Sequence, residues 1–156
     1  MLAGCLHVFV DVGSNVGVQL THLYEGSHGS KVARAFRRWF GPTAERLSST
    51  CAVLIEPNPH HEAALLRLCQ KFEARGARAA LLCRAASNYD GNASFYIAPA
   101  APQYHEWGSA LLDRTKGATR VQVQTIDLAR WLRQTVLARA GAGRGAVVMK
   151  LDVNWH

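Results

Sequence analysis

The sequence predicts an α/β fold built on an open, mostly parallel β-sheet, and two observations carry this prediction. Three apolar runs, at 7–12, 51–55 and 146–151, are rich in β-branched residues, and each contains or is followed by an acid near its end. Such runs are typical of strands buried on both faces of a parallel sheet. Segments with apolar residues at helical spacing separate them, which is the alternation of an α/β protein. The 156 residues, 49 % of them hydrophobic, suffice for one domain over 1–156.

The first strand is expected over 7–12, and a sharp turn follows it. A helix should begin near Asn15 or Val16 and end at Tyr24, where the sequence Glu-Gly-Ser-His-Gly stops it. We interpret 27–49 as an insertion on the rim of the sheet. It contains a helix over 31–40 whose Phe36, Trp39 and Phe40 should pack inward because they recur at helical spacing.

A second strand is expected over 51–55. Pro57 and Pro59 then lead the chain out of the sheet, because proline cannot continue a ladder of hydrogen bonds. A helix should follow over 60–75 and end at Gly76. We expect the adjacent His60 and His61 in its first turn to be surface residues, since neighbours on a helix point in different directions and no third metal ligand is near.

A third strand is expected over 79–84, continuing to 88. The Asp90-Gly91 pair between this run and 93–97 is a hairpin signal, so we predict a β-hairpin there. The segment 98–120 contains scattered prolines and glycines and is predicted to be a loop. Asn92-Ala93-Ser94 within the hairpin matches a glycosylation sequon, which matters only for a chain that enters the secretory pathway.

The last part of the chain should supply a fourth core strand. An alternating run at 121–125 indicates a half-exposed strand, and Thr125 or Asp127 is expected to cap a helix reaching about 140. The run at 146–152 again ends in an acid. The fourth strand would leave an exposed apolar edge through which the chain could pair with itself.

The turn after the first strand has the features of a nucleotide cradle. Asp11 is followed by Gly13 and Gly17, which let the backbone turn and approach a ligand. The spacing lacks the Gly-x-Gly-x-x-Gly of dinucleotide enzymes, which disfavours a dehydrogenase, and no Gly-Lys-Ser/Thr of a phosphate loop is present. A carboxylate at this position suits a cofactor with a cationic amino group and no phosphate, and S-adenosylmethionine is such a cofactor.

Glu56 repeats this arrangement at the end of the second strand. The carboxyl ends of parallel strands meet at one edge of a sheet, where ligands bind. We therefore expect Glu56 near Asp11, accepting hydrogen bonds from the two ribose hydroxyls of the cofactor.

Charge and cysteine content bear on the partners and the compartment expected for the chain. The formal charge is +7 and the pI about 9.7. Much of the excess positive charge lies on 31–38, where it is typical of the solvent-exposed face of a helix. We therefore do not expect a nucleic-acid partner. No Cys-x-x-Cys pair is present, and the four cysteines are expected to be buried reduced thiols in a reducing compartment. We find no signal peptide and no membrane span, so the default expectation is a soluble cytoplasmic chain without a metal.

The chain resembles the FkbM-type family of S-adenosylmethionine-dependent methyltransferases. Five motifs occur in the order of that family. They are Phe9-Val10-Asp11-Val12-Gly13-Ser14-Asn15-Val16-Gly17, Ile55-Glu56-Pro57-Asn58-Pro59, Ala85-Ala86-Ser87-Asn88 with Asp90-Gly91, Val123-x-Thr125-Ile126-Asp127, and Met149-Lys150-Leu151-Asp152-Val153.

The resemblance implies a Rossmann-like class I methyltransferase fold with helices on both faces, and methyl transfer to a hydroxyl of a sugar or small-molecule acceptor. It also implies the roles of individual residues. The methionine part of the cofactor would be held by Asp11, Gly13, Asn15 and Gly17, with Ser14 in the same loop, the ribose by Glu56, and the adenine by Ala86 and Ser87. After Val153 the family continues with Glu-Gly-Ala-Glu and further strands, whereas this chain reads Asn154-Trp155-His156. We therefore expect an incomplete sheet whose strands lie in the order third, second, first, fourth.

Asp152 is the candidate catalytic residue. At a strand end next to the expected methyl group it could position the acceptor or take its proton, although it could equally be a structural acid; His105 is a weaker candidate. The alternative function is a catalytically inactive cofactor-binding fragment or interaction module, because the substrate half of the family fold is missing.

Overall fold

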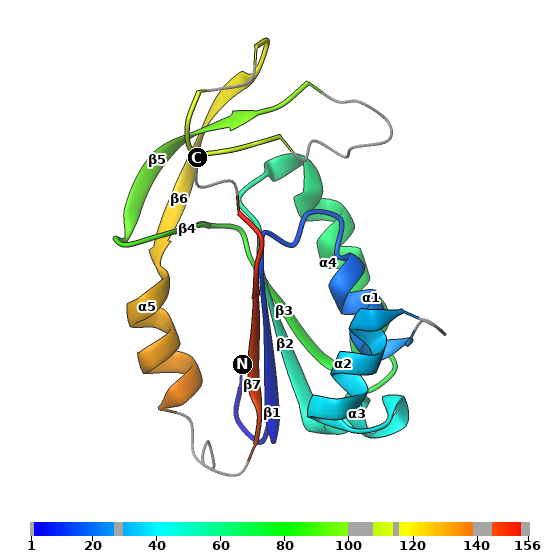
Figure 1. Cartoon of the computed structure of the whole chain (residues 1–156). Coiled ribbons are helices and arrows are strands. Elements are labelled where there is room, and N and C mark those ends of the chain that lie inside the picture. The colour runs from blue at the N-terminus through cyan, green and yellow to red at the C-terminus, as the bar shows by residue number, and fades with distance from the viewer. Residues whose placement is uncertain (1, 27–29, 100–107, 114–115, 139–144, 154–156) are drawn as a thin grey trace.

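The computed structural model describes residues 2–26, 30–99, 108–113, 116–138 and 145–153, and it shows an α/β architecture with two sheets (Figure 1). The main sheet has four parallel strands in the order β3-β2-β1-β7. Their bounds are His7–Val12 for β1, Thr50–Ile55 for β2, Arg78–Leu82 for β3 and Val147–Leu151 for β7. The predicted α/β class with a parallel sheet is thus confirmed.

The register of these strands brings their carboxyl ends to one edge. Val12 of β1 lies opposite Ile55 of β2 and Leu151 of β7, and Ile55 lies opposite Leu82 of β3. The residues that follow each strand therefore meet beyond that edge, Gly13, Glu56 and Asp152 among them. This placement is what the functional site depends on.

Helices cover both faces of the main sheet (Figure 1). One face packs against α1 (Val18–Tyr24), α2 (Lys31–Phe40), α3 (Thr43–Ser49) and α4 (Pro59–Glu73) around a core that includes Phe9, Leu54 and Phe72. The other face packs against α5 (Leu128–Trp131) and the π-helical turn η1 (Leu132–Leu137), where Val136 is fully buried beside Val10 and Val53. Alternate residues of β1 and β2 thus enter two separate cores, because successive side chains of a strand point to opposite faces.

The segment 27–49, expected to be an insertion on the rim of the sheet, is described from residue 30. Residues 30–49 form α2 and α3, and α3 runs directly into the first residue of β2 at the amino end of the sheet, away from the turn that follows β1 (Figure 1). Phe36 and Phe40 are buried beside Phe9, as their spacing predicts, whereas Trp39 is 45 % exposed. Phe36 and Phe40 therefore make this segment part of the core.

The second sheet lies beyond the carboxyl ends of the main strands and has the order β4-β6-β5 (Figure 1). Its strands are Ala85–Ser87 for β4, Gly91–Ile97 for β5 and Thr119–Asp127 for β6. The hairpin predicted across Asp90-Gly91 is wrong, because β6 lies between the two strands that this turn joins. The Asp90 carboxylate instead accepts a hydrogen bond from the Asp127 amide at 2.8 Å and pairs with Arg130, so the turn residue anchors the end of β6.

The segment 98–120 is partly described. It enters β6 at Thr119, and before that Ala110 exchanges two backbone hydrogen bonds with Tyr96 of β5, at 2.8 and 3.1 Å. His105 and the neighbouring aromatic residues Tyr104 and Trp107 lie outside the described residues. At the other end of β6, the Asp127 side chain accepts a hydrogen bond from the Arg130 amide at 2.9 Å and caps α5, one of the two caps expected.

Two of the cysteines form a disulfide, which corrects the expectation of reduced thiols. Cys5 and Cys51 are joined with 5.7 Å between their Cα atoms, while Cys69 is a buried free thiol and Cys83 an exposed one. The reason lies in the register, which sets Cys51 opposite Val8 and so close to the residues that precede β1. Cysteine spacing along the chain could not reveal this pairing.

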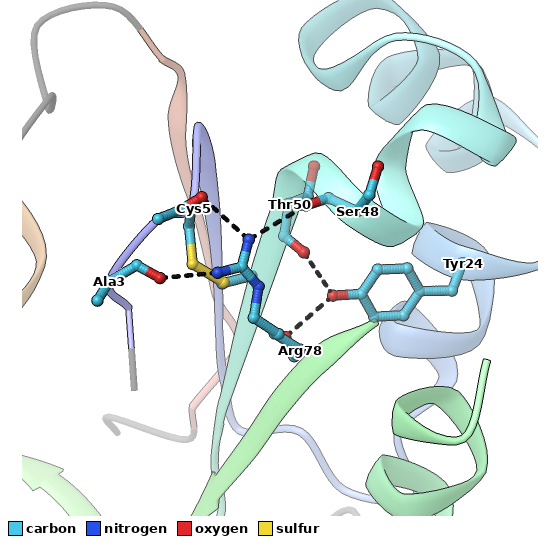
Figure 2. Close-up of a disulfide and its surroundings, with 8 residues drawn as sticks. Ala3, Cys5, Tyr24, Ser48, Thr50 and Arg78 are labelled. Carbon is cyan, nitrogen blue, oxygen red and sulfur yellow. Dashed lines mark hydrogen bonds between the residues drawn. A yellow bond between two sulfur atoms is a disulfide. The ribbon is translucent and has the colours of Figure 1, made fainter. Parts of the chain in front are cut away.

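An arginine clamp holds the same N-terminal segment (Figure 2). The Arg78 guanidinium donates hydrogen bonds to the carbonyls of Ala3, Gly4 and Ser48, at 2.7, 3.0 and 3.1 Å. The buried Tyr24 hydroxyl lies within hydrogen-bonding distance of the carbonyls of Thr50 and Arg78, at 2.9 and 3.2 Å.

Across the described ranges, no helix is long and apolar enough to cross a bilayer.

Candidate functional site

The turn after β1, over residues 13–17 and called the glycine turn below, is shaped by three residues with positive φ. Gly13, Asn15 and Gly17 have φ values of 75°, 49° and 78°. Gly13 donates its amide to the Ile55 carbonyl at 2.9 Å, and the Ser14 hydroxyl donates to the Asp11 carbonyl at 2.8 Å. These bonds fasten the turn to β1 and β2, and glycine is required at its ends because L side chains rarely adopt these conformations.

The two glycines also permit close packing. A Cβ at Gly13 would overlap the carbonyl oxygen of Asp152, and one at Gly17 would lie 2.5 Å from Cδ2 of Leu68 on α4. Gly13 thus allows the end of β7 to approach the turn, whereas Gly17 allows α1 to approach α4.

Glu56 links the glycine turn to the start of α4. One carboxylate oxygen accepts the Asn15 amide at 2.7 Å, and the other accepts the Asn58 amide at 3.0 Å. The residue is buried, and its carboxylate has two oxygens with several acceptor sites, so these two bonds leave acceptor capacity for a ligand.

Asp11 and Asp152 are connected through Lys150. The Lys150 ammonium donates to the Gly13 carbonyl at 2.8 Å and lies 3.3 Å from a carboxylate oxygen of Asp11 and 3.4 Å from one of Asp152. Asp11 is fully buried, whereas the Asp152 side chain is 79 % exposed. One cation thus holds a buried and an exposed carboxylate beside the glycine turn.

A cavity of about 730 Å³ opens above this edge of the main sheet. It is bounded by the glycine turn, the ends of β2 and β7, the start of α4, and β4, β5 and 109–112 from the other side. The lining residues are Val12, Gly13, Ser14, Asn15, Val16, Val18, Gln19, Ile55, Glu56, Pro57, Asn58, His61, Ala85, Ala86, Phe95, Ser109, Ala110, Leu111, Leu112, Lys150, Asp152 and Val153. Its size suits a ligand of nucleoside dimensions.

Most of the residues predicted from the sequence meet in this cavity. Six of them line it, namely Gly13, Ser14, Asn15, Glu56, Ala86 and Asp152. Asp11 is buried beneath the turn and Gly17 packs against α4, so these two residues support the turn without lining the cavity. Ser87 follows the lining residue Ala86 on β4 but does not line the cavity.

Three features of the site were missed at the level of sequence. Lys150 lies opposite Asp11 in the pairing of β1 with β7, and this pairing becomes evident only once the strand order is known. His61 is buried, with Nδ1 3.9 Å from a Glu56 oxygen, so its assignment to the surface is wrong. Phe95 of β5, part of the apolar cluster of the second sheet, also lines the cavity. Among the described residues no group of three or more His, Cys, Asp and Glu could hold a metal ion.

The burial of Asp11 predicts a specific pH dependence of stability. Burial raises the pKa of Asp11 to about 6, although Lys150 opposes the rise. Because this pKa lies above the ordinary aspartate value of 3.8, the folded state retains the proton to higher pH than the unfolded chain does. The free energy of unfolding therefore falls as the pH rises from about 4 to about 6, by about 3 kcal/mol from this group.

Urea unfolding of the wild type and Asp11→Asn over this range measures the effect. The wild type should lose stability relative to the variant as the pH rises, because the variant has no carboxyl group to ionise at this position. If the two stability profiles run parallel from about pH 4 to about pH 6, the raised pKa is contradicted.

Comparisons with protein-family models, with curated proteins and with solved structures found no match. The function of the chain is therefore inferred from the geometry of the cavity.

Proposed function

We propose that this chain binds S-adenosylmethionine in the cavity at the carboxyl edge of the main sheet. We further propose that it catalyses methyl transfer to a hydroxyl oxygen of a sugar or another small acceptor. A single observation carries this proposal: the glycine turn, Glu56 and Asp152 line one cavity of about 730 Å³. The arrangement agrees with the binding edge of open α/β sheets.

The lining has the chemistry that a nucleoside needs. Ile55, Ala86 and Phe95 offer apolar surface to a base, and the Glu56 carboxylate retains acceptor sites for vicinal hydroxyls beside its two backbone bonds. These groups come from β2, β4 and β5, so both sheets contribute to the binding of one ligand.

The charges favour a cationic ligand over a phosphate. Asp11, Glu56 and Asp152 lie around the turn, and the ammonium of Lys150 is shared between the first and the last of them. The carboxylates therefore outnumber this cation and would repel a pyrophosphate, whereas an amino group and a sulfonium are attracted.

Asp152 is the proposed acceptor-side residue. Its side chain is exposed at the cavity, and Lys150 holds one of its oxygens at 3.4 Å. S-adenosylmethionine supplies the methyl group, and Asp152 would orient the acceptor hydroxyl and receive its proton.

Isothermal titration calorimetry of the whole chain tests the binding step. We expect S-adenosylmethionine and S-adenosylhomocysteine to bind and NADH not to bind. Gly13→Ala should weaken binding by about tenfold or more, which corresponds to ~1.4 kcal/mol, because the added Cβ overlaps the Asp152 carbonyl and must displace β7 or the turn.

Gly76→Ala is the matched control. Gly76 also has a positive φ, of 90°, but an added Cβ would meet no atom within 4 Å. The Gly76→Ala variant therefore has the same kind of backbone strain as Gly13→Ala but no steric overlap. Its affinity for S-adenosylmethionine should match that of the wild type. A chain that binds none of these nucleosides, or binds NADH alone, would refute the proposal.

A second candidate is a binding or interaction module without activity. β7 is an edge strand among the described residues, and Met149 and Leu151 on it are 41 % and 49 % exposed. Such an edge can pair with a second copy of the chain. Methyl transfer to a panel of sugars decides between an enzyme and an inactive binder, and sedimentation equilibrium measures self-association.

A further inference from the structure

We propose that Asn92 is an N-linked glycosylation site, and that it carries an oligosaccharide on the outer face of the second sheet. The proposal does not depend on the function proposed above. It concerns a different surface and rests on three observations: the sequence around Asn92, its position on β5, and the disulfide at the opposite end of the main sheet.

The local sequence has the required acceptor pattern. Asn92-Ala93-Ser94 is the one Asn-x-Ser/Thr sequence in the chain. Asn92 is the second residue of β5, directly after the turn at 88–90, and its side chain is exposed.

The strand directs this side chain away from the core. Phe95 and Ile97 of β5 are buried in the apolar cluster of the second sheet, whereas Asn92 and Ser94, of the opposite parity, face outward. Phe95 is the β5 residue that lines the cavity. A glycan on Asn92 would therefore extend from the face opposite the cavity.

The neighbouring surface is polar and can accommodate sugar hydroxyls. Asn92 lies opposite Gln124 of β6, and the next outward pair is Ser94 with Gln122. The Ser94 hydroxyl accepts hydrogen bonds from Arg120 at 2.9 Å and from Gln122 at 3.2 Å. Across the described residues β5 pairs with β6 along its length and with Ala110 at Tyr96 alone, so a bulky group at Asn92 would break no ladder.

The disulfide supplies an independent indication of the compartment. Cys5 and Cys51 are bonded, and structural disulfides form in oxidising environments such as the lumen of the endoplasmic reticulum. N-linked glycans are attached in that same lumen. A chain that acquires this disulfide there would also expose its sequon to glycosylation.

The reaction is a transfer from a lipid-linked oligosaccharide diphosphate. A bond forms between the Asn92 side-chain nitrogen and the anomeric carbon of the first sugar. The bond between that carbon and the diphosphate oxygen breaks, the lipid diphosphate leaves with the electron pair, and the amide nitrogen loses one proton. No oxidant or reductant is consumed.

The first test uses the protein isolated from its own cells. Treatment with peptide N-glycosidase should increase its electrophoretic mobility, and mass spectrometry should find aspartate in place of Asn92 after release of the glycan. A native protein whose mobility does not change would overturn the proposal.

The second test uses the full chain directed into the secretory pathway of cultured cells by an added leader. The wild type and Ser94→Thr should carry the glycan, whereas Asn92→Gln and Ser94→Ala should lack it. Asn88→Gln is the matched control, because Asn88 is also exposed near the same turn but has no sequon. Circular dichroism of the enzymatically deglycosylated chains checks that every variant is folded.

The glycosylated chain must also reach the fold described here. Non-reducing peptide mapping should find the Cys5–Cys51 bond in the glycosylated wild type. A glycan found at another residue, or a glycosylated chain unable to form this bond, would contradict the proposal.

Discussion

Lys150→Met is expected to lower the free energy of unfolding at neutral pH by about 2–3 kcal/mol, because the buried Asp11 loses its cation and takes up a proton instead, and the hydrogen bond from Lys150 to the Gly13 carbonyl is lost. Asp11 is fully buried, and the Lys150 ammonium lies 3.3 Å from one of its oxygens. Methionine retains most of the aliphatic stem, so the variant removes the charge with little loss of packing. The loss is measured by urea unfolding followed by circular dichroism.

A surface ion pair provides the matched control. Lys71 lies 2.7 Å from Glu25, but both side chains are substantially exposed, at 53 % and 36 %. Lys71→Met should therefore cost less than about 1 kcal/mol. In the double variant Asp11→Asn/Lys150→Met the buried charge is removed together with its partner, so much of the lost stability should return. If Lys150→Met costs no more than Lys71→Met, the Asp11–Lys150 pair does not stabilise the fold.

The strand ends could be predicted from the sequence because each combines an apolar run with an acid. Parallel strands bring such ends to one edge, and this sufficed to gather Gly13, Asn15, Glu56 and Asp152 around a single cavity, whereas Ala86, on β4 of the second sheet, was expected there only from the family resemblance. Helix caps such as Asp127 were also accessible, since they depend on residues a few positions apart.

Features set by pairing between distant segments could not be predicted in this way. The Asp90-Gly91 turn has the local chemistry of a hairpin, yet β6 inserts between the strands it joins. Lys150 and His61 enter the site only through the register of β7 and the packing of α4. The disulfide has the same origin, because the pairing of β1 with β2 brings Cys51 to Cys5.

Reduction of the Cys5–Cys51 bond is expected to lower the free energy of unfolding by about 4 kcal/mol. This value is the loop-closure entropy of the unfolded chain for a sequence separation of 46 residues. The bond joins the segment before β1 to the second residue of β2, so it restricts two strands at the centre of the main sheet. Urea unfolding with and without dithiothreitol measures the difference.

Two variants separate the disulfide from other effects of the reductant. Cys83→Ser removes an exposed free thiol and should retain the full response to dithiothreitol, whereas Cys5→Ala/Cys51→Ala should be about as unstable as the reduced wild type and show no response. Arg78 still clamps Ala3 and Gly4 after reduction, so the N-terminal segment should stay docked in the folded state. The effect therefore belongs mainly to the unfolded chain, and an unchanged wild-type midpoint in dithiothreitol would show that the bond does not restrict it.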